Sequence, residues 1–297
     1  MSFVTAAPGI ADGRTAGRPR GNYTEERHMT TLAYTRSGAG APLVLLHGIG
    51  SSRHAWDPVI PALAAHFDVL AIDLPGFGDS GLLPPGAGSG PAALAAAVAG
   101  LLGEFGVTAP HVAGNSLGGW VALELAGIRP VASLTLLSPA GLWRGKVPLY
   151  NRVSLGATRW LSQHAAGALS RLVSYRLGRA LVLGQTHGRP FRLSPGYARA
   201  AIAAMGTSPG FDATMKASAT GYRSGPPIGA PVTVAFGSRD HLLLRQSRHL
   251  GQLPPGTRFA ALPHCGHVPM ADDPAAVAAL IAASSARARP AERQTAR

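Results

Sequence analysis

The chain has 297 residues, of which 46% are hydrophobic, and its formal net charge is +13 at neutral pH. This composition supports a full hydrophobic core and excludes a chain that is disordered throughout. A single cysteine, Cys265, excludes a disulfide framework and a cysteine-based metal cluster, and we expect the protein in the cytoplasm. No apolar run reaches the roughly 18 residues of a transmembrane helix, and residues 1–28 lack the apolar segment of a secretory signal.

The positive charge is concentrated in one segment. Residues 141–225 contain twelve lysines and arginines against a single acidic residue, Asp212, which gives a net charge of +11. Residues 29–140 and 226–284 together have a net charge of −2. The basic residues are spread through helical patterns, and no nucleic-acid-binding motif accompanies them. We therefore expect no nucleic-acid partner.

Short apolar runs alternate with helical patterns along the chain. We expect residues 1–28 to form a disordered tail, with either Met1 or Met29 as the start. The predicted strands are 43–46, 69–72, 111–114, 134–137, 232–236 and 258–262. The predicted helices are 58–65, 91–104, one that begins at Leu117, and 274–283. This alternation predicts an α/β fold with a mostly parallel central sheet and helices on both faces.

One strand-to-helix turn contains a serine between two glycines. In Gly-Asn-Ser-Leu-Gly, residues 114–118, Ser116 follows a predicted strand and precedes a predicted helix. A turn that exposes a serine in strained backbone geometry brings neighbouring side chains together, so the positions two before and two after it must be small. The alternative is a glycine-softened turn with an ordinary surface serine.

This G-x-S-x-G turn resembles the nucleophile elbow of the α/β-hydrolase superfamily. The stretch Leu-Leu-His-Gly-Ile-Gly, residues 45–50, resembles the loop that supplies one N–H group of the oxyanion hole in that superfamily. The resemblance implies Ile49 and Leu117 as the two backbone donors, and it implies a structural role for His47. The turn Asp-Leu-Pro-Gly-Phe-Gly-Asp-Ser, residues 73–80, is similar to a structural signature of the same superfamily.

The resemblance also implies an acid and a histidine in later loops, in the chain order Ser, acid, His. Asp240 follows the predicted strand 232–236, and His267 follows the predicted strand 258–262. Ser116 would then be the nucleophile, His267 the general base, and Asp240 the group that orients the imidazole. The alternatives are a helix N-cap for Asp240 and an ordinary loop histidine for His267.

Three neighbouring residues are weaker candidates for the site. His241 and His264 do not fit the Gly-x-x-Asp and Gly-His turns of the superfamily. We expect His264 and Cys265 to be packing residues. No metal-ligand motif and no dinucleotide-binding glycine motif is present in the sequence, so no metal and no cofactor is implied.

The basic segment falls where the superfamily inserts a helical cap, between its sixth and seventh strands. We therefore expect a hydrolase core at 29–140 and 226–284, a helical cap insertion at 141–225, and a disordered tail at 285–297. Eight apolar cap residues could line a substrate tunnel or simply pack the cap helices. They are Leu149, Val153, Leu155, Trp160, Leu161, Leu169, Leu172 and Val173.

A serine at the elbow implies acyl transfer, because superfamily members that open epoxides or displace halide have aspartate there. We expect a serine hydrolase that cleaves a carboxylic ester or a related acyl bond through an acyl-enzyme. One alternative is a C–C bond hydrolase of the meta-cleavage type, which the Gly-Asn-Ser elbow resembles, although those enzymes carry Trp after the histidine and this chain has Val268. Another is a non-catalytic module that binds an acidic partner through the cap.

The basic cap leaves several partners open. It predicts a small-molecule acyl substrate that is anionic or bound to an acidic carrier protein, as for some esterases that the chain resembles. Attraction to a membrane surface is a rival interpretation. A compositional preference for arginine without a binding role is the third.

Overall fold

The computed structural model describes residues 32–288, so the predicted tail 1–28 and most of the tail 285–297 lie outside the described residues. The seven strands found there are β1 (Tyr34–Ser37), β2 (Ala41–Leu46), β3 (Phe67–Ile72), β4 (His111–Asn115), β5 (Ser133–Leu137), β6 (Val232–Gly237) and β7 (Arg258–Leu262). They form one sheet in the order β1-β3-β2-β4-β5-β6-β7. Only the pairing of β1 with β3 is antiparallel, which confirms the mostly parallel sheet.

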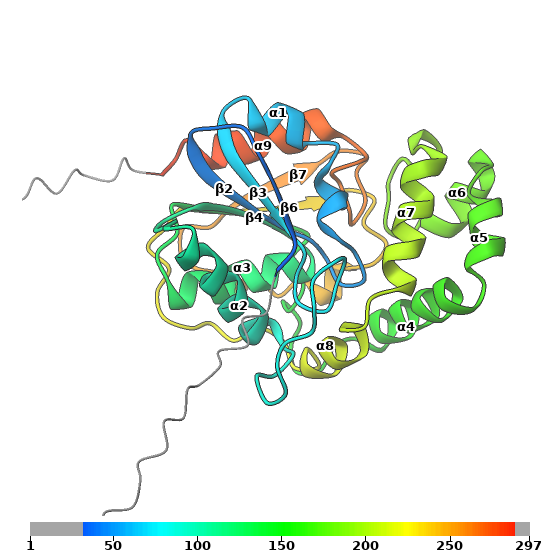
Figure 1. The fold of residues 1–297 in the computed structure, drawn as a ribbon, viewed down its shortest axis with the longest axis horizontal. Helices are drawn as coiled ribbons and strands as arrows, with labels where there is room; N and C mark the ends of the chain where they lie inside the picture. The colour runs from blue at the N-terminus through cyan, green and yellow to red at the C-terminus, as the bar shows by residue number, and fades with distance from the viewer. Residues whose placement is uncertain (1–31, 289–297) are drawn as a thin grey trace, which may run out of the picture.

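Helices cover both faces of this sheet (Figure 1). The helices of the core are α1 (Ile60–Ala64), α2 (Pro91–Glu104), α3 (Leu117–Ile128) and α9 (Pro274–Ser285). Side chains of β2 alternate between the two faces, with Val44 and Leu46 packed on the side of α2 and α3, and Leu43 and Leu45 on the side of α1 and α9. All six predicted strands and four predicted helices of the core are present. The sequence does not predict β1, because its half-buried and exposed side chains alternate without an apolar run.

A group of helices between β5 and β6 lies beside the sheet rather than against one of its faces (Figure 1). They are α4 (Leu149–His164), α5 (Ala166–Leu172), α6 (Arg176–Leu183), α7 (Pro195–Gly206) and α8 (Phe211–Ala217). Residues of this group, including Val173 and Ile202, form a small apolar core of their own. Within the described residues, this insertion lies between β5 and β6.

Four short 3₁₀ helices complete the described structure. They are η1 (Arg53–Trp56), η2 (Pro190–Arg192), η3 (Arg245–Ser247) and η4 (Leu250–Gln252). None of the helices within residues 32–288 combines the length and apolar character that a membrane span needs.

The carboxyl ends of the parallel strands lie along one edge of the sheet. Leu46 pairs with Gly114, Asn115 with Leu137, and the last residues of β6 and β7 are also register partners. The loops that follow β2, β4, β6 and β7 therefore begin side by side. In open α/β sheets this is the edge where ligands bind, and each predicted site residue lies in one of these loops or, for Leu117, at the start of a helix.

Candidate active site

Ser116 occupies a strained turn between β4 and α3. Its backbone angles are φ 53° and ψ −114°, a conformation that side chains rarely adopt. A Cβ atom on Gly114 would lie 2.2 Å from the carbonyl oxygen of Gly118, and one on Gly118 would lie 2.1 Å from that of Leu46. The two glycines are therefore required by close backbone contacts, as the sequence pattern predicted.

Asp240 and His267 meet at the ends of β6 and β7. His267 Nδ1 lies 3.1 Å from Asp240 Oδ2, and both side chains are buried. The other carboxylate oxygen, Oδ1, accepts hydrogen bonds from the backbone N–H groups of Leu242 at 3.0 Å and Leu243 at 2.9 Å. Asp240 thus binds a turn with one oxygen and contacts the imidazole with the other. No helix begins at Leu242, so the alternative of a helix N-cap at Asp240 was wrong.

The environment of Asp240 favours its ionised form. Burial alone would raise the pKa of this carboxyl group, but the charge and hydrogen bond of His267 and the N–H of Leu243 outweigh burial and hold the pKa below its ordinary value. The guanidinium of Arg248 lies 3.6 Å from Asp240 Oδ2 and adds a positive charge on the same side. A fixed carboxylate in this position can stabilise a protonated imidazole.

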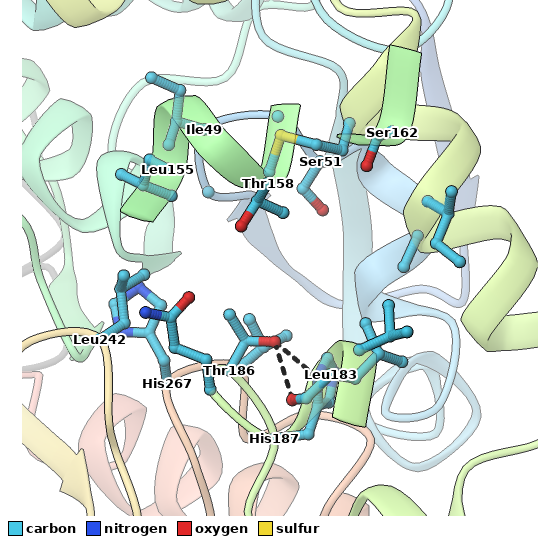
Figure 2. A pocket seen from close by; sticks show the side chains of 18 of the residues that line it. Ile49, Ser51, Leu155, Thr158, Ser162, Leu183, Thr186, His187, Leu242 and His267 are labelled. Atoms are coloured by element: carbon cyan, nitrogen blue, oxygen red, sulfur yellow. Dashed lines mark hydrogen bonds between the residues drawn. The ribbon is translucent and has the colours of Figure 1, made fainter. Parts of the chain in front are cut away.

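The second ring nitrogen of His267 faces a cavity that Ser116 also lines (Figure 2). His267 Nε2 is buried, and within the described residues it has no hydrogen-bond partner, Ser116 Oγ included. Catalytic hydrogen bonds of this kind are often long before substrate binds. Ser116 and His267 therefore line one cavity without a direct hydrogen bond between their side chains.

The loop after β2 approaches the nucleophile closely. A Cβ atom on Gly48 would lie 3.3 Å from Ser116 Cβ, so this loop passes directly beside the serine. The N–H groups of Ile49, in this loop, and Leu117, the first residue of α3, donate no hydrogen bond to any part of the chain that the structure describes. Two such N–H groups on either side of a nucleophile can receive an oxyanion.

Buried polar groups hold this loop in place. His47 Nε2 accepts a hydrogen bond at 3.0 Å from the N–H of Leu74, and burial lowers the pKa of His47, which keeps its ring neutral. The carboxylate of Asp73 accepts the backbone N–H of Arg53 at 2.6 Å and also pairs with the Arg53 side chain. His47 and the turn that begins at Asp73 thus make the structural contacts that the resemblance implied.

The cavity has a volume of about 460 Å³ and lies between the core and the cap. Four of the eight apolar cap residues proposed for a tunnel line it: Leu155, Leu161, Leu169 and Leu172. The other four do not, because Leu149, Val153 and Trp160 are exposed on the cap surface and Val173 is buried within the cap. Most of the remaining cap lining comes from α6 and α7, which the sequence did not single out.

A cluster of three polar side chains, Thr186, His187 and Tyr197, forms part of the lining. His187 Nε2 lies 3.3 Å from the hydroxyl of Tyr197, and His187 Nδ1 lies 3.0 Å from Thr186 Oγ1 (Figure 2). Burial lowers the pKa of His187 to about 4, so its ring is neutral near pH 7. Burial also raises the pKa of Tyr197. Both side chains line the cavity and can bind a polar part of a substrate.

Two further side chains hold the loop of His267, and neither was predicted from the sequence. The amide of Asn115 donates to the carbonyl oxygens of His267 at 2.8 Å and Leu137 at 3.0 Å. Asp272 is 5% exposed and accepts the N–H groups of Gly188 at 2.7 Å and Gly266 at 2.8 Å. Asp272 therefore joins the loop of His267 to the segment that leaves α6 in the cap.

The neighbouring candidates have other environments. His264 is exposed, with φ 62°, so the expectation that it packs in the interior was wrong. Cys265 is fully buried, as expected, and burial raises the pKa of its thiol to about 11. His241 is exposed next to Asp240. Among residues 32–288, no three His, Cys, Asp or Glu side chains gather as ligands of a metal ion would.

The amino-acid sequence is similar to parts of known proteins that are named for different activities. The chain is 44% identical over 106 residues to the dihydrolipoyllysine-residue acetyltransferase component of the acetoin cleaving system of Pseudomonas putida, which is 35% of this chain and 28% of that protein. It is 34% identical over 167 residues to the pimeloyl-[acyl-carrier protein] methyl ester esterase of Aeromonas hydrophila, which is 54% of this chain and 61% of that protein. The chain thus spans less than two thirds of the length of these relatives.

Solved structures show the same fold. The epoxide hydrolase CorEH has a TM-score of 0.69 and 24% sequence identity, over 87% of this chain and 96% of that one. At this identity the similarity concerns the fold alone. The sequence model of the Alpha/beta hydrolase family matches residues 43–280 of the chain. This range includes every residue of the site described above. The chain belongs to the alpha/beta hydrolase family.

Proposed function

We propose that the chain is a serine hydrolase that cleaves a carboxylic ester through an acyl-enzyme. One observation carries the proposal. His267 is bound to Asp240 through Nδ1, while its buried Nε2, which has no hydrogen-bond partner among the described residues, faces the cavity that Ser116 lines from a strained elbow. An imidazole with one nitrogen fixed by a carboxylate and the other open toward a serine is the arrangement of a general base.

The proposed reaction has two halves. Ser116 Oγ attacks the ester carbonyl carbon while His267 Nε2 takes the hydroxyl proton, and the N–H groups of Ile49 and Leu117 stabilise the oxyanion. The intermediate collapses, the C–O bond breaks, and His267 returns the proton to the leaving alcohol. Water then attacks the acyl-enzyme with His267 as base, which releases the carboxylic acid and restores Ser116. Asp240 stays ionised throughout.

Two cavities of different size suggest how large the two groups of the ester are. The cavity of about 460 Å³ is mostly apolar and accommodates a long chain. A second cavity of about 40 Å³, between Ser116, Trp120 and Trp143, leaves room only for a small group. We propose a small-molecule substrate with one long apolar group and one small group. The Aeromonas hydrophila relative is named for a methyl ester on a carrier-bound chain, which supports this form and an anionic or carrier-bound substrate.

Other activities have less support. A serine at the elbow disfavours epoxide opening, which needs a carboxylate nucleophile in the family that the chain resembles. A C–C hydrolase keeps the support of the Gly-Asn-Ser elbow, but the residue after His267 is Val268, and it lines the cavity where those enzymes carry Trp. A non-catalytic binding module gives no reason for an unpaired buried imidazole nitrogen beside a serine. We propose the cytoplasm as the location because the only cysteine, Cys265, is buried and unpaired.

A fluorophosphonate probe tests the proposal directly. We expect stoichiometric labelling of Ser116, located by peptide mass spectrometry, together with hydrolysis of p-nitrophenyl butyrate. Ser116→Ala should lose both the label and the turnover. Ser51→Ala, which removes another serine of the same cavity, should still be labelled at Ser116. Labelling of a different serine, or turnover that survives in Ser116→Ala, would contradict the assignment.

A further inference from the structure

Exposed leucines of the cap form the rim of the large cavity. Leu161, Leu172 and Leu181 line the cavity, yet 42%, 37% and 78% of their surfaces are exposed. Leu177 precedes Leu181 by one turn of α6 and is 77% exposed, so both side chains lie on one face of this helix. The apolar interior of the cavity therefore continues onto the outer surface of the cap.

The same rim carries positive charge that no carboxylate neutralises. Arg171 and Arg176 are exposed on α5 and α6, each next to a leucine of the rim in the sequence. Across residues 32–288, neither arginine lies within ion-pair distance of an acidic side chain. The single acidic residue of the cap, Asp212, pairs with Arg159 at 3.7 Å. The rim thus combines projecting leucines with unpaired guanidinium groups.

We propose that this rim docks onto the surface of an anionic lipid bilayer, and that the acyl chain of the substrate enters the cavity from that surface. Large apolar side chains beside arginines on one short helix are typical of segments that lie in a bilayer interface. Anionic headgroups pair with Arg171 and Arg176, while Leu177 and Leu181 reach the apolar region beneath. The acyl-chain part rests on the proposed hydrolase function, but the docking does not.

Two other occupants fit the rim less well. A two-fold contact with a second copy would press the same arginine-bearing surface against itself, because such an interface uses one patch on both subunits. An acidic protein would pair with Arg171 and Arg176, but it gives no reason for leucines that project from the opening of an apolar cavity. A bilayer accounts for the charge, the leucines and their place at the cavity.

Co-sedimentation of the full chain with lipid vesicles tests the docking. We expect binding to vesicles of phosphatidylcholine mixed with phosphatidylglycerol, and at most weak binding to phosphatidylcholine alone. Leu177→Asp should lower binding to the anionic vesicles by about tenfold or more, since it places a negative charge in the interface. Ile128→Asp makes the same change at a 58% exposed position on α3 of the core and should bind like the wild type.

Two controls separate docking from catalysis. Leu177 is not among the residues that line the cavity, so Leu177→Asp should hydrolyse soluble p-nitrophenyl butyrate at the wild-type rate. Ser116→Ala should bind vesicles like the wild type, so failure of the proposed reaction would not affect the docking result.

Three results would overturn the docking proposal. They are absence of binding to the anionic vesicles, equal binding to both vesicle types, and equal binding by Leu177→Asp and the wild type. If Arg176→Gln alone weakens binding, the apolar contact is absent and an acidic protein becomes the better partner.

Discussion

In the core, the central parallel strands β3, β4, β5 and β6 bury most of their side chains, whereas the cap leaves many of its large apolar side chains in contact with solvent. Of the exposed large hydrophobic residues in the described part of the chain, ten lie between residues 141 and 225 and five lie elsewhere. The charges differ in the same way, with +11 in the cap and −2 in the core. Packing requirements therefore explain the core, but they leave the surface of the cap unexplained.

This contrast suggests different roles for the core and the cap. The core fixes Ser116, Asp240 and His267 at the ends of strands, where rigid turns hold reacting groups in place. The cap supplies most of the cavity wall, so in the proposed reaction it would select the acyl chain that fits. Substitutions at the core site should therefore abolish turnover, while changes on the cap surface should leave the turnover of soluble esters intact.

The largest expected effects are at the three core residues. Ser116→Ala, His267→Ala and Asp240→Asn should each lower kcat by about a thousandfold or more without unfolding the protein. The losses should not add in double variants, because the three groups act as one unit. Steady-state kinetics and thermal unfolding measure both quantities. A His267→Ala variant that keeps more than about a tenth of wild-type kcat would exclude His267 as the general base.

A smaller effect is expected at the oxyanion loop. Ile49→Pro removes a backbone N–H and should lower kcat by roughly a hundredfold, whereas Ile49→Ala keeps the N–H and should have a mild effect. Circular dichroism and thermal unfolding must show that the proline variant is folded. Equal kcat in the two variants would place the oxyanion donor elsewhere.

The contact between core and cap gives the next prediction. Asp272→Ala removes the acceptor that joins Gly266, beside His267, to Gly188 in the cap. We expect kcat to fall by about tenfold or more, because small displacements of a catalytic group are costly. Asp273→Asn, which changes the neighbouring carboxylate but retains an N-cap for α9, is the matched control. If the two variants are equally active, Asp272 does not position the histidine loop.

The last prediction concerns stability in acid and leaves the turnover near neutral pH unchanged. The unfolded chain protonates His187 near its ordinary pKa of 6.5, but the folded chain does so only near 4. The unfolded state therefore binds more protons in this window, and the free energy of unfolding should fall by about 3 kcal/mol as the pH drops through it. Urea unfolding at several pH values should show a smaller fall in His187→Gln. His164→Gln, at an exposed site on α4, should behave like the wild type.

The sequence could predict the core because its signals are local. Each strand is an apolar run that ends in a turn, and Ser116, Asp240 and His267 each occupy a short turn at a strand end. Asn115 and Asp272 could not be recognised in this way, because each makes a contact that is distant in the chain. Asn115 contacts His267, 152 positions away, and Asp272 links the nearby Gly266 to Gly188, 84 positions away. Their side chains are ordinary for a turn and a helix start, and only the folded chain shows their contacts.

The cap could be predicted as a helical insertion but not as a cavity wall. An apolar residue on a helix can face the cavity, the cap interior or solvent, and sequence periodicity does not distinguish these cases. Leu161 and Trp160 illustrate the difficulty, because they are neighbours in the chain and only Leu161 lines the cavity. The failure to predict β1 has a similar cause, since this edge strand buries too little to show an apolar run.

Trapping of the acyl-enzyme tests directly whether Ser116 is the nucleophile that forms a covalent intermediate. The wild-type protein is mixed rapidly with p-nitrophenyl butyrate, quenched in acid during the first turnovers, and examined by intact-mass and peptide mass spectrometry. We expect one butyryl group per chain, attached to Ser116, together with a burst of p-nitrophenol when deacylation limits the rate. Active enzyme with a butyryl group on another residue, or turnover that persists after Ser116 is replaced by alanine, would contradict this role of Ser116.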